Sequence, residues 1–377
     1  MGDPILKLLV QPRDGIEPLI AGIKHAKKSI DILIFRMDWK ELETALKAAA
    51  GRGVAVRALI AHTNRGGEPG LRQLETRFLE AGITVARTAD DLIRYHGKMM
   101  ITDHRTLFLL SFNFVHLDIE HSRGFGIVTR NAKLVQEADK LFEADISRKP
   151  YTAGLSTLIV SPSNARKQLS EFIKQAKKQL LIYDPQIADR QIMRILEDRA
   201  KGGLEVRIIG AAVAHSTNLK VTPLTTMRLH TRTIIRDGRE VFLGSQSLRQ
   251  PELDSRREIG VIVKDSGVVK GILATFEKDW GSTGFDEARE ELAKQALNKE
   301  VLLAPPETTA KATRALVKEM PPLRTALKKA IKQAVSRAGE DAVAHADVKM
   351  AVKEAVKKAV NEAVTEIVLK EQEKPKK

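Results

Sequence analysis

Two stretches of the chain repeat one pattern of a histidine, a long cationic side chain, an aspartate and a serine. In each stretch the cation follows the histidine by two positions, the aspartate follows the cation by five, and the serine follows the aspartate by eight. The residues are His96, Lys98, Asp103 and Ser111, and then His230, Arg232, Asp237 and Ser245. Because residues two apart in a strand point to one face, each histidine should lie beside its cation. Such a pair suits a tetrahedral phosphate, since the imidazole can attack or protonate while the cation neutralises the oxygens.

A single match to this pattern would be weak evidence, because the chain has nine histidines and many cations. Two matches at equivalent places of a repeated unit are much harder to explain by chance. The alternative is that His96 and His230 are partly buried strand residues with structural hydrogen bonds. The sequence has no His-Glu-x-x-His motif and no paired His/Asp cluster. We therefore expect chemistry that uses no metal and no cofactor.

An internal duplication gives the two motifs equivalent positions. Three blocks of sequence recur at a constant offset of 150 residues. The first copies lie at 8–12, 23–28 and 53–57, and the second copies lie at 158–162, 173–178 and 203–207. One register that holds through three blocks indicates a duplicated unit, because chance similarity would drift.

The repeated unit alternates strands and helices. Apolar runs at 30–35 and 180–183 are typical of strands that are buried on both faces. Helical stretches at 40–50 and 189–200 come next, and a glycine follows each of them. This alternation predicts an α/β fold with two similar halves, each a mixed β-sheet flanked by helices.

A hairpin should carry the second motif away from its histidine and back again. Asp237-Gly238 is a strong signal for a two-residue turn, with strands at 233–236 and 240–243. Asp103 begins the equivalent turn in the first half. The returning strand of each hairpin should bring a serine hydroxyl back toward the histidine.

The second half is shorter than the first. The two histidines are 134 residues apart, so the second half lacks about sixteen of the residues that the offset of 150 requires. We expect the missing part to be the helix at 71–80 and part of the strand after it. In the second half the segment 211–227 should then be a loop.

Composition favours anionic partners. Lys and Arg number 63 against 48 Asp and Glu, which gives a formal charge of +15. The sequence has no cysteine, so disulfides, thiolate metal sites and a cysteine nucleophile are excluded. It also has no apolar run of the roughly 20 residues that a membrane span requires. We expect a cytoplasmic protein with at most peripheral contact with a membrane.

Three parts follow from these observations. They are a first half at 1–150, a shortened second half at 151–285, and a basic Ala/Lys/Val-rich tail at 286–377. Valines recur every four residues from Val348 onward, which is helical patterning, although this period drifts around a helix of 3.6 residues per turn. The tail could be a helix packed on the body, a helix that binds a protein partner, or a semi-ordered basic arm.

The two motifs and the duplication together resemble the phospholipase D superfamily. That family carries an HxKx4D motif twice, each followed by a Gly-Ser-x-Asn-like segment, and the resemblance covers residues 8–263. It implies one active site at the interface of the two halves, a phosphohistidine intermediate, and no metal. Carried over by position, His96 is the nucleophile and His230 is the general acid/base.

The resemblance also implies roles for the other residues of the motifs. Lys98 and Arg232 would clamp the phosphate, and Asp103 and Asp237 would orient the histidines and tune their charge. Further hydrogen bonds to the substrate would come from Ser111, Asn113, Ser245 and Ser247. Glu258 matches the downstream acidic position of the family.

The chain departs from the family pattern at several positions. Arg232 replaces the second lysine, and its planar, longer side chain requires a reshaped pocket. Leu110 replaces the glycine before the first serine, and Ser247 replaces the second asparagine. Gly124 stands where the acidic residue of the first half would align, although Glu120 is nearby. Because both histidines and both aspartates are intact, we interpret the chain as an active enzyme with a modified pocket.

Three functions remain open at this point. The first is a phospholipid enzyme, either a phospholipase D or a cardiolipin-synthase-like phosphatidyl transferase, which the presence of both motifs in one chain favours. The second is a nuclease, which the charge favours but the scarcity of aromatic side chains disfavours. The third is a catalytically weakened basic adaptor that binds phosphates. We expect an anionic phosphodiester substrate, and phospholipid ahead of nucleic acid.

Overall fold

The computed structural model describes residues 6–63, 68–213 and 218–285 of the chain. The basic tail at 286–377, for which helical patterning was expected, lies outside the described residues.

The first half is built around a mixed sheet. Its strands are β1 (Leu6–Gln11), β2 (Ser29–Ile34), β3 (Ala55–Ile60), β4 (Thr84–Arg87), β6 (Met99–Thr102), β7 (Thr106–Leu110) and β8 (Ser122–Thr129). They lie side by side in the order β1-β8-β7-β6-β2-β3-β4. The helices are α1 (Glu17–His25), α2 (Lys40–Gly51), α3 (Glu68–Glu80), α4 (His116–Glu120) and α5 (Ala132–Ile146).

The second half repeats this plan. Its sheet has the order β12-β11-β10-β14-β15-β17-β9. The strands are β9 (Leu158–Val160), β10 (Gln179–Ile187), β11 (Glu205–Ala212), β12 (Lys220–Thr222), β14 (Arg232–Arg236), β15 (Glu240–Gly244) and β17 (Ile259–Val263). The helices are α6 (Ala165–Lys174), α7 (Arg190–Lys201), α8 (Gln250–Asp254) and α9 (Ser266–Gly281). The predicted α/β fold with two similar halves is therefore confirmed.

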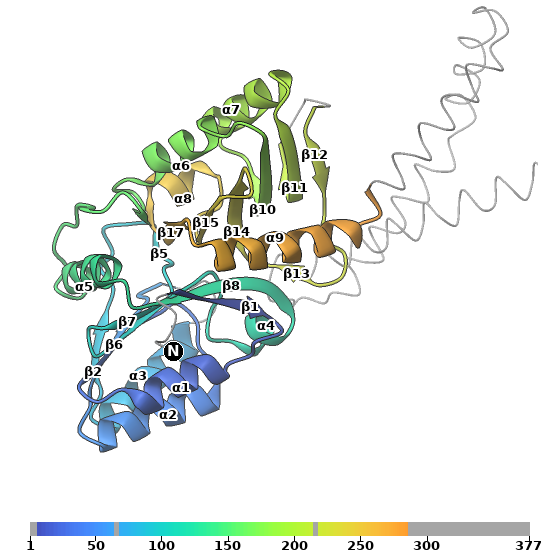
Figure 1. The fold of residues 1–377 in the computed structure, drawn as a ribbon. Helices are drawn as coiled ribbons and strands as arrows, with labels where there is room; N and C mark the ends of the chain where they lie inside the picture. The colour runs from blue at the N-terminus through green and yellow to red at the C-terminus, as the bar shows by residue number, and fades with distance from the viewer. Residues whose placement is uncertain (1–5, 64–67, 214–217, 286–377) are drawn as a thin grey trace, which may run out of the picture. The chain divides into compact units, whose positions relative to one another are not determined.

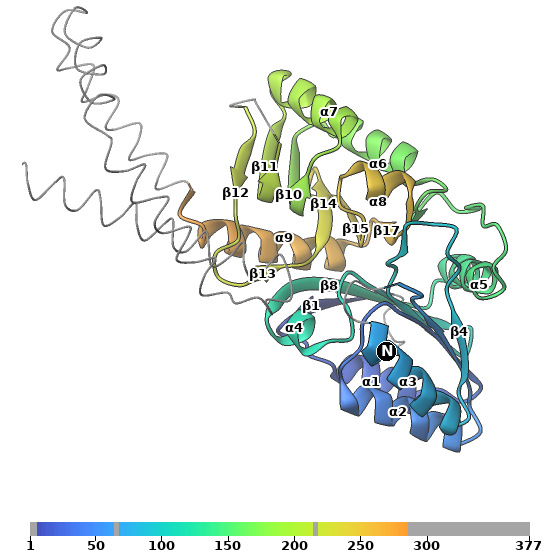
Figure 2. The same cartoon turned by 180° about the vertical axis from the view of Figure 1, so that it is seen from behind.

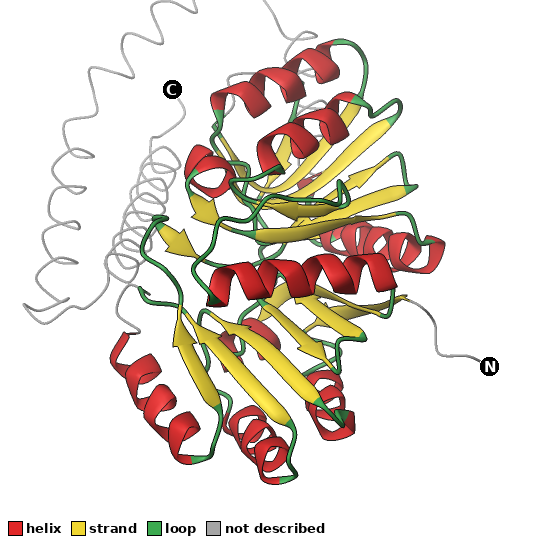
Figure 3. Cartoon of the chain, turned by 90° about the vertical axis from the view of Figure 1, so that its left-hand side faces the viewer, coloured by secondary structure: helices red, strands yellow, loops and turns green. Residues whose placement is uncertain are grey.

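Burial explains the layering of the helices against the sheets. The central strands β2 and β10 are almost entirely buried, as their apolar runs predicted. Helices α1, α2 and α3 cover the outer face of the first sheet, and α6 and α7 cover the outer face of the second (Figures 1 and 2). Helices α5 and α9 lie between the two sheets (Figure 3). The apolar core around these two helices takes residues from both halves, which form one compact unit.

The two hairpins have the tight turns that the sequence indicated. Asp237 and Gly238 have φ values of 54° and 63°, and the turn joins β14 to β15 in antiparallel register. Asp103 and His104 have φ values of 54° and 50° in the equivalent turn between β6 and β7. Positive φ at both central positions matches the twist of the flanking strands, which is why short polar residues or glycine are favoured there.

The shortening of the second half removes a helix but keeps a strand. Helix α3 joins β3 to β4 in the first half, and the second half has no counterpart to it within the described residues between β11 and β12. The expectation that 211–227 is entirely a loop is wrong. Ala211 and Ala212 end β11, and β12 pairs with β11 in parallel. A short strand is retained because it covers the edge of β11 and satisfies its backbone groups.

Candidate active site

Backbone hydrogen bonds between the two halves hold both histidines at the interface. The His96 amide donates to the Arg257 carbonyl at 2.7 Å, beside the parallel pairing of β5 (Arg94–Tyr95) with β16 (Arg256–Arg257). The His230 amide donates to the Arg123 carbonyl at 3.1 Å, beside the pairing of β13 (Arg228–Leu229) with β8. Each histidine is therefore pinned to the opposite half, just before the strand that carries the rest of its motif.

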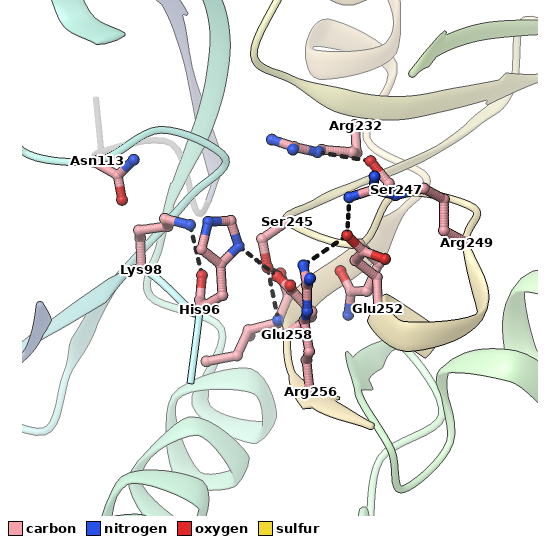
Figure 4. Close-up of polar contacts among 12 residues, drawn as sticks. His96, Lys98, Asn113, Arg232, Ser245, Ser247, Arg249, Glu252, Arg256 and Glu258 are labelled. Atoms are coloured by element: carbon pink, nitrogen blue, oxygen red, sulfur yellow. Dashed lines mark hydrogen bonds and ion pairs between the residues drawn. The ribbon is translucent and has the colours of Figure 1, made fainter. Parts of the chain in front are cut away.

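His96 faces a buried carboxylate of the second half. Its Nδ1 lies 2.8 Å from Oε2 of Glu258, whose side chain is fully buried (Figure 4). The ring of Phe35 packs edge-on against the imidazole, with centroids 4.5 Å apart. When Nδ1 carries the proton and donates a hydrogen bond to Glu258, Nε2 has a free lone pair. This tautomer of the imidazole is the one required for nucleophilic attack.

His230 faces a carboxylate of the first half. Its Nε2 lies 3.4 Å from Oδ2 of Asp118 on α4, and both side chains are buried. The other ring nitrogen, Nδ1, is buried and has no hydrogen-bond partner in the described part of the chain. The same Asp118 oxygen accepts from the Asn113 amide at 2.9 Å and from Asn113 Nδ2 at 2.6 Å. Asn113 therefore holds the carboxylate that faces His230.

The two cations of the motifs have equivalent anchors. Lys98 Nζ donates to the carbonyl of His96 at 2.6 Å (Figure 4). Arg232 Nη1 donates to the carbonyl of His230 at 2.5 Å. Lys98 is 1% exposed, and Ser247 accepts a further bond from Arg232 Nε at 3.1 Å. Each cation thus folds back on its own histidine and is fixed in place before a substrate binds.

The electrostatic setting favours the neutral form of both imidazoles. Burial, followed by repulsion from Lys98 and Arg232, lowers the pKa of His96 well below its ordinary 6.5. Burial and then Arg232 lower the pKa of His230 in the same way, with a further contribution from Lys98. The same two cations therefore act on both histidines.

Burial of Glu258 acts in the opposite direction on that carboxyl. It raises the pKa of Glu258, while Lys98 partly offsets the effect. Burial likewise lowers the pKa of Lys98, and the charge of Glu258 opposes this shift. The positive charge of Lys98 therefore helps to keep Glu258, the partner of His96, ionised.

The motif aspartates lie away from the histidines, which corrects the expected role. The Asp103 carboxylate accepts from the backbone amides of 27–29, and Asp237 accepts from those of 177–179. Each aspartate lies seven positions after its histidine, which is about 20 Å of extended chain. The aspartates instead fasten the hairpin turns to the segment before β2 or β10. These backbone bonds outweigh burial and lower the pKa of both carboxyl groups.

The serines divide into two kinds. Ser111 Oγ accepts from the Phe125 amide at 2.9 Å, and Ser245 Oγ accepts from the Ile259 amide at 3.1 Å. Both hydroxyls join neighbouring strands, and that of Ser245 also forms a hydrogen bond with the Glu258 carboxyl, which faces His96. Ser247 instead contacts the Arg232 guanidinium and so lies within the site.

Asp118 is the site residue that sequence reasoning missed. Gly124 does align with Glu258, since their spacing is 134 residues, and it provides no side chain. The replacement is not Glu120, whose side chain is half-exposed and contacts His116 and His121. At the same spacing Asp118 aligns with Glu252, so the repeat register could have drawn attention to it.

A cluster of possible metal ligands lies outside this site. Asp31, His104 and Asp139 bring ligand atoms within 4.8 Å of one another. Arg57 already occupies Asp31 through two hydrogen bonds of 2.6 and 2.8 Å, so a cation would have to displace that pair. The cluster shares no residue with the histidine pair.

Comparison with known protein families agrees with this geometry. Residues 19–146 and 169–280, more than half of the chain, match the family described as "Cardiolipin synthase, PLD-like domain". The chain belongs to the phospholipase D superfamily. The two matched segments correspond to the two halves, so the duplication and the family assignment support each other. No curated protein sequence matches the chain.

Several solved structures are similar to this chain. Polyphosphate kinase from Porphyromonas gingivalis is 20% identical with a TM-score of 0.63, over 73% of this chain and 50% of the kinase, so the chain spans half of that protein's length. Phosphatidylserine synthase from Haemophilus influenzae Rd KW20 is 12% identical with a TM-score of 0.56, over 79% and 94% of the two chains. Nuc, a phospholipase D family member from Salmonella typhimurium, is 22% identical and covers 39% of this chain and 97% of its own, with a TM-score of 0.36.

Across the described helices, none is long and apolar enough to pass through a bilayer.

Proposed function

We propose that the protein transfers phosphodiester groups without a metal, through a covalent phosphohistidine, and that its substrates are phospholipids. The observation that carries this proposal is the reciprocal arrangement of the histidine pair. Each imidazole has one nitrogen against a carboxylate of the opposite half, and an anchored cation of its own motif beside it.

The reaction then proceeds in two displacements. In the first, His96 Nε2 attacks phosphorus, the bond to the leaving alcohol breaks, and His230 gives that alcohol its proton. In the second, neutral His230 takes a proton from water or another alcohol, whose oxygen attacks phosphorus and breaks the bond to His96. Water gives hydrolysis and an alcohol gives transfer. Lys98 and Arg232 neutralise the equatorial oxygens in both transition states.

His96 is assigned as the nucleophile because its carboxylate contact is the shorter of the two. At 2.8 Å, the hydrogen bond to Glu258 both orients the ring and stabilises the positive charge that develops on it. The contact of His230 with Asp118 is 3.4 Å, which suits a ring that gains and loses a proton in each cycle.

The lipid substrate class rests on the comparisons. The matching family is described by cardiolipin synthase, and the fold extends over nearly all of a phosphatidylserine synthase. Phosphate esters of glycerol have poor leaving groups, which is the case in which a general acid such as His230 contributes most.

A second candidate is phosphoryl transfer that involves polyphosphate, or cleavage of another polyanion such as nucleic acid. The specific observation is the number of cations that act on the histidines, since Arg94, Arg256 and Arg228 add to Lys98 and Arg232. The likeness in fold to a polyphosphate kinase fits such a substrate. A polyanion would bind these three arginines as well as Lys98 and Arg232, whereas a single phosphodiester needs only Lys98 and Arg232.

The first test is turnover of a chromogenic phosphodiester with and without EDTA, by wild type, His96→Ala and His104→Ala. His104 is a half-exposed histidine in the turn after β6, and it serves as the matched control. We expect EDTA-resistant turnover that the His104 variant keeps and the His96 variant loses. Turnover that EDTA abolishes, or that His96→Ala retains, would contradict the mechanism.

The second test separates the substrates. Wild type and His96→Ala are incubated with vesicles of anionic phospholipid, with polyphosphate and with single-stranded DNA, and the products are measured. The proposal requires product from the vesicles that depends on His96. His96-dependent product from polyphosphate or DNA alone would transfer the assignment to the second candidate. Binding of phosphates with no turnover of any substrate would leave a phosphate-binding adaptor.

A further inference from the structure

A cleft of about 680 Å³ lies on the first half, between α1 and the strands beneath it. Its floor is apolar and includes Phe108, Pro18 and Val128. Its rim carries four basic side chains, which are Lys7, His25, Arg105 and Arg130. Asp103 also lines it, but backbone amides of 27–29 already bond to that carboxylate. The volume falls within the range of about 300–1,000 Å³ that is typical of small-molecule sites.

The second half shows that the fold does not require this cleft. There Arg236 extends from β14 to α6, donating to the Phe172 carbonyl at 3.0 Å and to Gln175 Oε1 at 2.9 Å. Its guanidinium lies 4.2 Å from the centroid of the Phe172 ring and pairs with Glu240 at 2.7 Å. This bridge of arginine and phenylalanine occupies the space between hairpin and helix.

In the first half none of the four residues of that bridge is kept, and three of them are replaced by smaller, uncharged residues. At the spacing of 134 residues, Thr102 replaces Arg236 and Thr106 replaces Glu240. At the spacing of 150 residues, Gly22 replaces Phe172 and His25 replaces Gln175. A Cβ on Gly22 would lie 2.4 Å from Phe108 Cζ, so the absence of a side chain lets that ring lie against α1 as the floor. All four substituted residues line the cleft.

The substitutions also change the charge. The first half has no equivalent of the ion pair between Arg236 and Glu240, because threonines stand at both positions. The side chains that remain on the rim of the cleft are mainly basic. The guanidinium groups of Arg105 and Arg130 and the ammonium group of Lys7 lie around an apolar floor. This combination suits a ligand that has an anionic head and an apolar or aromatic body. Phosphate suits such a rim, because arginine can form bidentate bonds with it.

We propose that this cleft binds a phosphomonoester carried on an apolar or aromatic body, and that it is separate from the catalytic site. The hairpin turn at Asp103 borders the cleft, while His96 lies at the opposite end of β6, about 20 Å away along the extended chain. A free nucleotide and the head of a phosphatidic acid share the proposed chemistry.

The repeat provides a matched control. Arg105 and Arg239 take the same position in the two hairpin turns, where their amides donate to the carbonyls of Thr102 and Arg236 at 3.0 Å each. Both side chains are exposed, but only Arg105 is among the residues that line the cleft. Charge reversal at these two positions changes the net charge equally, and binding of a phosphate at the catalytic site would respond equally to both.

The test is calorimetric titration of the full chain with AMP in one arm and with a short-chain phosphatidic acid below its micellar concentration in the other. We expect saturable binding of at least one probe, weakened about tenfold or more in Arg105→Glu and in Lys7→Glu, and unchanged in Arg239→Glu. Thermal unfolding of each variant verifies the fold. Which probe binds more tightly identifies the source of the phosphate. Absence of binding by both probes, or equal weakening in the variants of Arg105 and Arg239, would overturn the proposal.

Discussion

At the level of single residues, the neutral state of both histidines predicts an acidic optimum for the free enzyme. One displacement needs a neutral His96 and a protonated His230, yet burial and the two cations lower the pKa of both below 6.5. The fraction of enzyme with one proton on the pair therefore falls as pH rises. We expect kcat/KM for a diester with an alkyl leaving group to be maximal below about pH 6.5.

Substrate binding should move the optimum of kcat upward, because the phosphate anion favours a charged imidazole. Initial rates from about pH 4.5 to pH 8.5 measure both profiles. The stability of the protein must be measured over the same pH range. In the unfolded chain His96 and His230 take up protons below about pH 6.5, whereas in the folded protein their lowered pKa values oppose protonation. The free energy of unfolding therefore falls as the pH drops through this range. A value of kcat/KM that still rises above pH 7 would contradict the assignment.

Asp118 supports a second prediction, because its carboxylate faces the ring nitrogen of His230. Asp118→Asn should leave His230 without an anionic partner and weaken its action as an acid. We expect kcat to fall roughly 10- to 100-fold on a diester with an alkyl leaving group, less than the roughly 10²- to 10⁴-fold that complete loss of acid–base catalysis costs. With a nitrophenyl leaving group, which needs no proton, the decrease should be small.

This comparison of leaving groups separates a positioning role from simple damage to the site. Glu252→Gln is the control, because Glu252 takes the same place in the second half and contacts Arg249 and Arg256. Equal losses on both diesters, or an effect of Glu252→Gln that matches that of Asp118→Asn, would show that Asp118 does not act through His230.

At the level of elements, local patterns predicted what local physics controls. The strands at β2 and β10 and the helices α2 and α7 follow from apolar runs and glycine stops, and the hairpins follow from turn residues that tolerate positive φ. The family resemblance pointed to Glu258 as an acidic position, but its contact with His96, 162 residues away, was not predicted.

The errors have a common cause. The role of Asp103 was carried over from the family resemblance, although the predicted hairpin already placed this aspartate at the turn, at the far end of the strand from His96. Asp118 was missed because the acidic residue was expected at Gly124, on the strand, whereas α4 provides it from the side. Which side chains meet across the interface is decided by packing of the halves, and a single sequence does not show that packing.

At the level of the whole molecule, two buried ion pairs join the halves with the symmetry of the repeat. Arg123 of β8 forms bonds of 2.7 and 2.8 Å with Asp279 of α9, and Arg257 of β16 lies 3.1 Å from Asp145 of α5. Each arginine belongs to one half and each aspartate to the other. The carbonyls of Arg123 and Arg257 also hold His230 and His96, so the residues that join the halves also position the catalytic pair.

These contacts predict that Asp279→Ala destabilises the fold far more than removal of an exposed partner does. Truncation leaves the buried Arg123 charge uncompensated, which costs about 3–5 kcal/mol. Glu277→Ala, two positions earlier on α9, removes a half-exposed partner of Arg207 and should cost less than about 1 kcal/mol. Urea unfolding of both variants measures the difference. If Asp279→Ala costs no more than Glu277→Ala, the halves are held together by their apolar core around α5 and α9, and the arginines serve only to place the histidines.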